Sequence, residues 1–134
     1  MDATSFAVMS LAIGAGSALG GMLRYWCSFL IARTLGETFP LGTLFVNVVG
    51  SFLIVLFAEV TGPDGRLLVS SLARQFVMVG IFGGYTTFSS FSLQTLNLAP
   101  NNEWVPALTN VALSLILCLA SAWLGHIAGT AVNR

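Results

Sequence analysis

The stretch that decides the fold is a polar interruption of an apolar chain: Gly83, Gly84, Tyr85, Thr86, Thr87, Phe88, Ser89, Ser90, Phe91 and Ser92. Apolar runs of the membrane type lie on both sides of it, at residues 76–82 and 105–132. The stretch must therefore lie at bilayer depth, where unpaired hydroxyl groups and a glycine-loosened backbone each cost several kcal/mol. We expect it to face protein, an ion or a narrow aqueous path, and not lipid.

Composition places the rest of the chain in a membrane as well. Only 7% of the 134 residues are charged, and the formal net charge is zero. Four stretches without charge reach the ~20 residues that a helix needs to cross a hydrocarbon core; they cover residues 3–23, 38–58, 75–102 and 104–133. The first lacks a basic leader, which favours a retained span over a cleaved signal peptide.

The sequence therefore predicts an all-α integral membrane fold, with a single transmembrane domain over residues 1–134. Its third helix is expected to be broken near the middle. The four transmembrane helices are expected at about 6–31, 41–60, 75–97 and 104–130.

The arginines orient the chain only weakly. If both termini share one side, that side holds Arg66, Arg74 and Arg134, the other side holds Arg33, and there is no lysine. Under the positive-inside rule so small a bias leaves two alternatives open. The chain inserts in both orientations, or these few arginines fix one of them.

Small residues in the first span indicate close helix packing. Gly16 and Gly20 form a small-xxx-small pair, which lets transmembrane backbones approach each other. Arg24 follows one turn later, toward the end of the span. It can anchor the helix at the interface or attract an anion into a vestibule, and both interpretations stay open.

Asn47 is the polar outlier of the second span. An amide at that depth must find hydrogen-bond partners, and Gly50 and Ser51, three and four residues later, make the same helix face small. The amide either joins helices or offers its N–H groups to an anion. Taken alone, the residue favours the joining of helices.

The third span combines a helix break with a polar ridge. Gly83 and Gly84, reinforced by Gly80, lower helix propensity, so we expect a break there that exposes backbone carbonyls. If the helix resumes at about Thr87, residues three and four apart share a face. Thr87, Ser90 and Gln94 then form one ridge, with Phe88, Phe91 and Thr95 beside it.

Other reactive side chains are expected to be structural. Cys27 and Cys118 lie in apolar segments as small hydrophobes, without the neighbours that a zinc site needs. For His126, a packed or snorkelling histidine is favoured over a ligand or a proton carrier. Glu59 and Arg66 are expected to form a solvated interfacial pair.

The deep polar groups are neutral, and no carboxylate lies at mid-membrane. A proton-coupled cation carrier typically needs an intramembrane Asp or Glu, so this class is disfavoured. An anion path needs amide and hydroxyl donors, helped by phenyl rims, which carry the positive end of the ring quadrupole. The residues indicate an anion channel or carrier; the deep polar groups are Thr43, Asn47, Ser51, Thr86, Thr87, Ser89, Ser90, Gln94, Asn110 and Ser114.

Three blocks of sequence, in order, resemble the Fluc (CrcB) fluoride channels over nearly the full chain. They are Gly Gly Met Leu Arg Tyr at 20–25, Gly Thr Leu Phe Val Asn Val Val Gly Ser Phe at 42–52, and Gly Gly Tyr Thr Thr Phe Ser Ser Phe at 83–91. The resemblance implies a passive, fluoride-selective channel that exports the ion from the bacterial cytoplasm across the cytoplasmic (inner) membrane. It also implies an antiparallel, dual-topology homodimer with two pores.

The resemblance further implies roles for single residues. Asn47 is similar to the pore-lining asparagine, and Phe88 and Phe91 to the two rings whose edges contact fluoride. Main-chain carbonyls of Gly83 and Thr86 from both subunits would hold a structural Na⁺ at the dimer interface. The same polar route would be lined by Thr43, Ser90, Gln94, Asn110 and Ser114, and Arg24 would lie near the vestibule.

Two positions depart from the family. Gln94 stands where many members have a glutamate, which removes a charge from the expected pathway. Val55 replaces a residue that is often small, which affects packing of the second span.

The main alternative is a small four-helix multidrug or metabolite exporter. That class depends on a glutamate deep in its first span, where this chain has none. A second alternative is a non-conducting subunit, but packing alone would not require glycines, hydroxyls and paired phenyl rings in one stretch. An enzyme is disfavoured, because the sequence has no nucleophile–base pair and no metal-ligand cluster.

Overall fold

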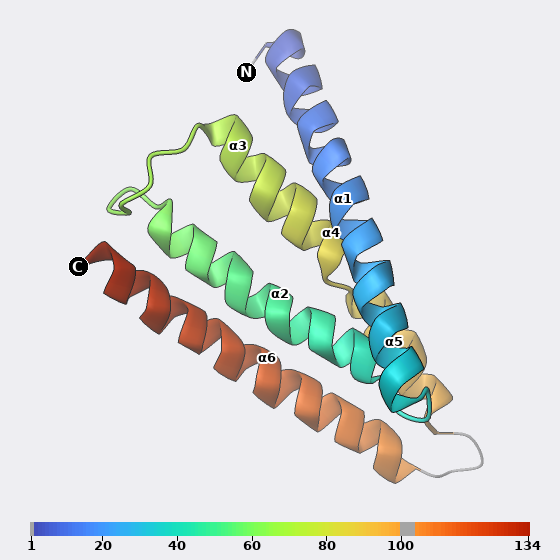
Figure 1. Cartoon of the computed structure of the whole chain (residues 1–134). Coiled ribbons are helices and arrows are strands. Elements are labelled where there is room, and N and C mark those ends of the chain that lie inside the picture. The colour runs from blue at the N-terminus through green and yellow to red at the C-terminus, as the bar shows by residue number, and fades with distance from the viewer. Residues whose placement is uncertain (1, 100–103) are drawn as a thin grey trace.

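The computed structural model describes residues 2–99 and 104–134, and every element in them is helical (Figure 1). All four helical runs are long and apolar enough to cross a membrane, so the predicted four-helix membrane fold is confirmed. Three runs are single helices: α1 Ala3–Leu35, α2 Leu41–Val60 and α6 Trp104–Asn133. The third run has four pieces: α3 Ser71–Gln75, the π-helix η1 Phe76–Phe82, α4 Gly83–Tyr85 and α5 Phe88–Asn97.

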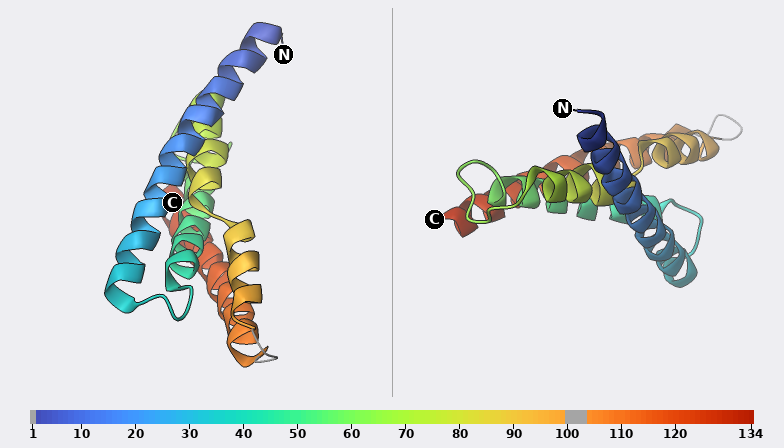
Figure 2. Two further views of the ribbon diagram at one scale, coloured as in Figure 1. Left: turned by 90° about the vertical axis from the view of Figure 1, so that its right-hand side faces the viewer. Right: turned by 90° about the horizontal axis from the view of Figure 1, so that it is seen from above.

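The helices pack as two parallel pairs. α1 lies beside α3, η1 and α4, whereas α2 lies beside α6 (Figure 1). Small residues join α2 to α6: Gly125 faces the Phe52 carbonyl, and the Ser121 hydroxyl donates to the Val48 carbonyl at 2.8 Å. Past the interruption of the third run, α5 packs on α6 (Figure 2). The interruption therefore moves the chain from one helix pair to the other.

Glycines bring α1 into contact with η1 and α4. A Cβ added to Gly16 would lie 2.9 Å from the Gly80 Cα, and one added to Gly84 would lie 2.9 Å from the Ser17 Cα. A Cβ at Gly20 would clash with the Ile81 carbonyl. The close packing predicted from Gly16 and Gly20 is confirmed, since their faces meet backbone and not side chains.

The helix interruption does not fall on the glycines, where it was expected. Gly83 and Gly84 are helical, and the extended residues are Thr86 (φ −82°, ψ 158°) and Thr87 (φ −154°, ψ 114°). Gly80 and Gly84 are needed for contact with α1, which keeps this segment helical. The run opens at Thr86 and Thr87, where the Thr87 backbone bonds to Asn47 of α2.

The expected pair between Glu59 and Arg66 is wrong. The Glu59 carboxylate lies 2.8 Å from His126 Nδ1. Its Cβ packs against Gly129, where α6 has no side chain, and this lets the carboxylate reach the histidine. The Arg66 backbone N–H donates instead to Asn133 Oδ1 at 3.1 Å. His126 is thus packed and hydrogen-bonded, in line with the favoured structural interpretation.

The glycine contact makes a direct prediction for stability. Gly20→Ala should lower the free energy of unfolding in detergent by about 2 kcal/mol, because overpacking a close contact costs ~1–3 kcal/mol. Gly14→Ala and Gly21→Ala are matched controls on the same helix, since an added Cβ meets nothing within 4 Å. They should be neutral or stabilising by up to about 1 kcal/mol, the gain in helix propensity. Equal effects at all three positions would contradict the packing.

Candidate anion pathway at the helix interruption

The side-chain amide of Asn47 pairs with the backbone of Thr87 at the helix interruption. Its Nδ2 donates to the Thr87 carbonyl at 3.0 Å, and its Oδ1 accepts from the Thr87 N–H at 2.8 Å. The amide thus satisfies backbone groups where the helical ladder is interrupted, at a depth where no bulk water replaces them. The interpretation of Asn47 as an amide that joins two helices is confirmed.

A small helix face on α2 admits the interruption. A Cβ added to Gly50 would overlap the methyl group of Thr86, so the missing side chain lets the extended segment lie against α2. The Ser51 hydroxyl donates to the carbonyl of Asn47 at 2.7 Å, within α2. The predicted small face at Gly50 and Ser51 therefore serves the approach of the third run.

Thr87 restarts the helix as the N-cap of α5. Its Oγ1 accepts from the Ser90 N–H at 3.1 Å, and its hydroxyl donates to Ser90 Oγ at the same distance. Thr87 Oγ1 and Ser89 Oγ lie 3.2 Å apart. The hydroxyls of this stretch thus form a local network around one helix end.

Two carbonyls lose their helical donors at the interruption. In a continuous helix the Thr87 N–H would donate to the Gly83 carbonyl, and the Ser90 N–H to the Thr86 carbonyl. Both N–H groups bond to side chains instead, those of Asn47 and Thr87. The two carbonyls expected to hold a cation are therefore released from the helix, and carbonyl oxygens are hard ligands that suit Na⁺.

A groove of about 340 Å³ opens beside the interruption. The ring centroids of Phe88 and Phe91 are 5.2 Å apart, with the planes tilted by 52°. Phe88 is 75% exposed and projects from the single chain. The groove brings together residues of α2, α5 and α6, among them Asn47, Ser51, Phe88, Phe91, Ser114 and Cys118.

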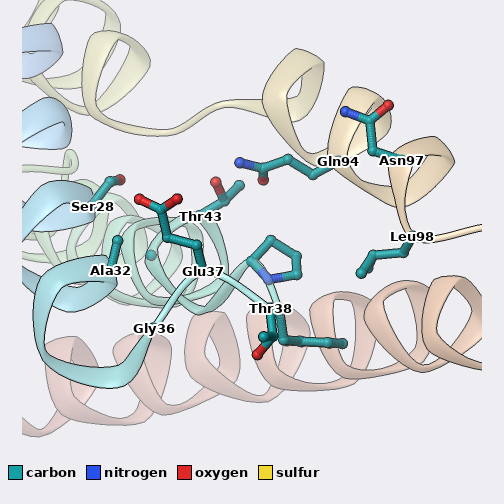
Figure 3. A pocket seen from close by; sticks show the side chains of 12 residues that line it. Ser28, Ala32, Gly36, Glu37, Thr38, Thr43, Gln94, Asn97 and Leu98 are labelled. Atoms are coloured by element: carbon teal, nitrogen blue, oxygen red, sulfur yellow. The ribbon is translucent and has the colours of Figure 1, made fainter.

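A second cavity of about 490 Å³ lies where α1, α2 and α5 meet. Thr43 and Gln94 both line it, and Gln94 extends from α5 toward Thr43 (Figure 3). Gln94 Oε1 is buried and has no hydrogen-bond partner within the described residues. Because Thr43 lies one helical turn before Asn47, this cavity and the groove follow one face of α2.

The remaining candidates lie apart from these two spaces. Asn110 is only 2% exposed, and its Nδ2 donates to Thr95 Oγ1 at 2.8 Å. Ser90 is engaged by Thr87. Arg24 lines neither the groove nor the cavity, but it lies one turn before Ser28, which lines the cavity. The structure thus gathers Thr43 with Gln94, and Asn47 with both phenylalanines and Ser114.

Several lining residues were not among the sequence candidates, including some with polar or thiol side chains. Ser28, Glu37 and Asn97 line the cavity, and Cys118 lines the groove. Helical spacing could have found two of them, because Ser28 is four residues after Arg24 and Cys118 is four residues after Ser114. Glu37 and Asn97 lie at helix ends, where spacing along one helix carries no such signal.

Replacing Asn47 tests the contribution of its two hydrogen bonds with Thr87. Asn47→Ala leaves the Thr87 N–H and carbonyl without these partners, so the free energy of unfolding in detergent should fall by about 3 kcal/mol, given ~1–3 kcal/mol per unsatisfied buried group. Amide exchange of Thr87, followed by NMR, should also speed up. Ser92→Ala is the matched control, because the Ser92 hydroxyl donates to the Phe88 carbonyl in an exposed hydrogen bond within α5. A loss as large in the control would contradict a specific contribution of the two Asn47 hydrogen bonds.

Comparison with known proteins agrees with these features. Residues 11–126 match the family described as CrcB-like protein, Camphor Resistance (CrcB). A Fluoride-specific ion channel FluC of Opitutus terrae is 57% identical over 123 residues, which are 92% of this chain and 93% of that protein. The FluC of Rhodospirillum rubrum is 54% identical over 124 residues, 92% of this chain and 96% of that protein. The chain therefore belongs to the CrcB family.

Proposed function

We propose that the chain is a fluoride-selective passive channel that exports fluoride from the cytoplasm. The observation that carries this proposal is the groove in which Asn47, Ser114 and the two phenylalanine rings converge at bilayer depth. The relatives with 57% and 54% identity are both named fluoride-specific ion channels. The activity is ion transport and needs no chemical step.

The groove suits a small anion that must give up its water. Fluoride binds water strongly, so only close donors replace its hydration shell, and a narrow passage provides them. The second N–H of the Asn47 amide remains for the ion, because the first donates to Thr87. The positive rims of Phe88 and Phe91 complete the passage. The ion enters through the cavity at Thr43 and Gln94 and reaches the groove one turn along α2.

Arg24, Ser90 and Asn110 act around this route. The positive charge of Arg24 raises the anion concentration near the mouth of the cavity. A single charge does this without binding the ion. Ser90 and Asn110 act through their neighbours, since each is hydrogen-bonded to a threonine of the same region. Thr87 and Thr95 are these threonines.

The working unit is an antiparallel homodimer with two pores in the bacterial cytoplasmic (inner) membrane. The groove of one chain is open on one side, and Phe88 projects from it, so a second chain is needed to enclose an ion there. The weak arginine bias permits both orientations.

A structural Na⁺ at the dimer interface fits the carbonyls of Gly83 and Thr86. Both carbonyls have lost their helical donors, and two chains would supply four such oxygens. A bound cation would supply positive charge that holds the two interrupted helices together. The hydrogen bonds of Asn47 and Thr87 fix the directions of these carbonyls. Shared binding of one ion would therefore fix how the two chains are oriented.

Fluoride efflux from liposomes, measured with a fluoride electrode, tests the function. We expect fluoride to leave the liposomes much faster than chloride. Chloride is too large to replace its water with the same donors. Comparable rates for the two anions would refute fluoride selectivity. Transport of organic cations in place of fluoride would favour the small multidrug exporter class.

The same assay tests the phenyl rims. Phe88→Ile should abolish fluoride efflux and leave the fold unchanged, because the ring is mostly exposed in the single chain. Phe29→Ile is the matched control, since Phe29 is also exposed but lines neither the groove nor the cavity. Undiminished efflux of the Phe88 variant would remove this residue from the pathway.

Removal of sodium tests the cation site. Exchange of Na⁺ for a large organic cation during purification should lower the thermal stability of the dimer, and added Na⁺ should restore it, as expected for a ligand that binds only the folded state. The readout is the melting temperature and the dimer fraction in detergent. Identical values in both salts would argue against a bound Na⁺, whatever the outcome of the efflux assay.

A further inference from the structure

The connection between α2 and α3 exposes three consecutive apolar side chains. Leu67, Leu68 and Val69 are 53%, 95% and 39% exposed. They lie outside any helix, between Val60 at the end of one candidate span and Ser71 at the start of the next. The connection between two spans emerges at the membrane surface, so these side chains are held close to that surface.

Hydrogen bonds fix both ends of this segment. The Arg66 N–H donates to Asn133 Oδ1 at 3.1 Å, and the Leu67 N–H donates to the Val60 carbonyl at 2.9 Å. At the other end, Ser70 Oγ accepts from the Ala73 N–H at 3.2 Å as the cap of α3. The apolar side chains are therefore presented outward by a braced loop.

Two arginines flank the apolar side chains. Arg74 Nε donates to Thr61 Oγ1 at 3.3 Å, which leaves its two terminal NH₂ groups for another partner. Neither Arg66 nor Arg74 forms an ion pair within residues 2–99 and 104–134. Asp64 is exposed in the same connection and offsets one of the two charges. The loop thus carries a net charge of about +1 at its base, which complements an anionic surface.

We propose that Leu67, Leu68 and Val69, with Arg66 and Arg74, form a contact site for anionic phospholipid. The apolar side chains enter the boundary between headgroups and acyl chains, and the guanidinium groups contact lipid phosphate. The hydrocarbon core is excluded, because a non-helical backbone needs water that the core lacks. The headgroup region offers both water and apolar contact. One net arginine charge near such a surface enriches anionic lipid about fivefold.

Tryptophan fluorescence of the full chain in vesicles tests the depth of the loop. Leu68→Trp is made in a background with phenylalanine at positions 26, 104 and 123, the native tryptophans. Asp64→Trp in the same background is the matched control for a polar position of the connection. The vesicles mix phosphatidylcholine and phosphatidylglycerol, with one of the two brominated near the headgroup. Leu68→Trp should emit at shorter wavelength than the control and be quenched by brominated lipid.

The same vesicles test the choice of headgroup. At equal mole fraction, brominated phosphatidylglycerol should quench Leu68→Trp more than brominated phosphatidylcholine does. Arg66→Gln with Arg74→Gln should abolish this preference and retain quenching by phosphatidylcholine. In the otherwise native chain, the same two substitutions remove two positive charges and should lower the ratio of anionic to zwitterionic phospholipid that copurifies by about 25-fold, about fivefold for each arginine.

Each contrary result overturns the proposal. Emission of Leu68→Trp like that of the control, without quenching, would place the loop in water. A shift to shorter wavelength without quenching would mean that protein, such as a second copy of the chain, covers the loop. Equal quenching by the two lipids, or an unchanged copurification ratio in the arginine variant, would refute a site for anionic headgroups.

Discussion

The pair of hydrogen bonds between the Asn47 amide and the backbone of Thr87 is the constraint on which the rest of the structure depends. The third run must pass from α1 to α6, and it does so through two extended residues at bilayer depth. An unpaired backbone group there costs several kcal/mol. A carboxamide carries both a donor and an acceptor, so it satisfies the N–H and the carbonyl of one residue. A serine lacks the reach for both, and a carboxylate lacks the donor.

That constraint changes the meaning of the glycines. Gly80 and Gly84 serve contact with α1, and their low helix propensity, about 1 kcal/mol each relative to alanine, is offset by packing of backbone on backbone. Gly83 differs, because an added Cβ would meet only the Met78 carbonyl, at 3.9 Å. The Gly83 carbonyl has lost its helical donor, and the space beside Gly83 is open. The proposed second chain would need this open space to approach the carbonyl. Within the polar stretch, Gly84 thus packs against α1, Thr86 and Thr87 interrupt the helix, and Gly83 leaves a surface that no described part of the same chain covers.

Much of this could be predicted from the sequence, because hydropathy and small-residue spacing are local signals. The four spans, the contact at Gly16 and Gly20 and the joining role of Asn47 are of this kind. The position of the interruption and the partner of Glu59 could not be predicted. The first depends on which glycines meet α1, and the second on a missing side chain at Gly129. The position of the interruption and the partner of Glu59 both depend on contacts with a neighbouring helix. A residue pattern within one helix carries no information on such contacts.

On the proposed function, the two spaces along α2 differ in how they treat a strongly hydrated ion, since Glu37 lines the cavity whereas uncharged residues line the groove. The cavity at Thr43, about 490 Å³, has room for roughly ten or more waters at about 30 Å³ each, and water can donate to the buried Gln94 Oε1. That oxygen would repel a bare anion, so on the proposed function the ion passes Gln94 while hydrated. The smaller groove offers donors and ring rims in place of water. Because these partners carry no full charge, they would release the ion readily, as conduction requires. On the proposed function, Gln94 therefore favours passage, since a cationic side chain at the same place would hold the anion.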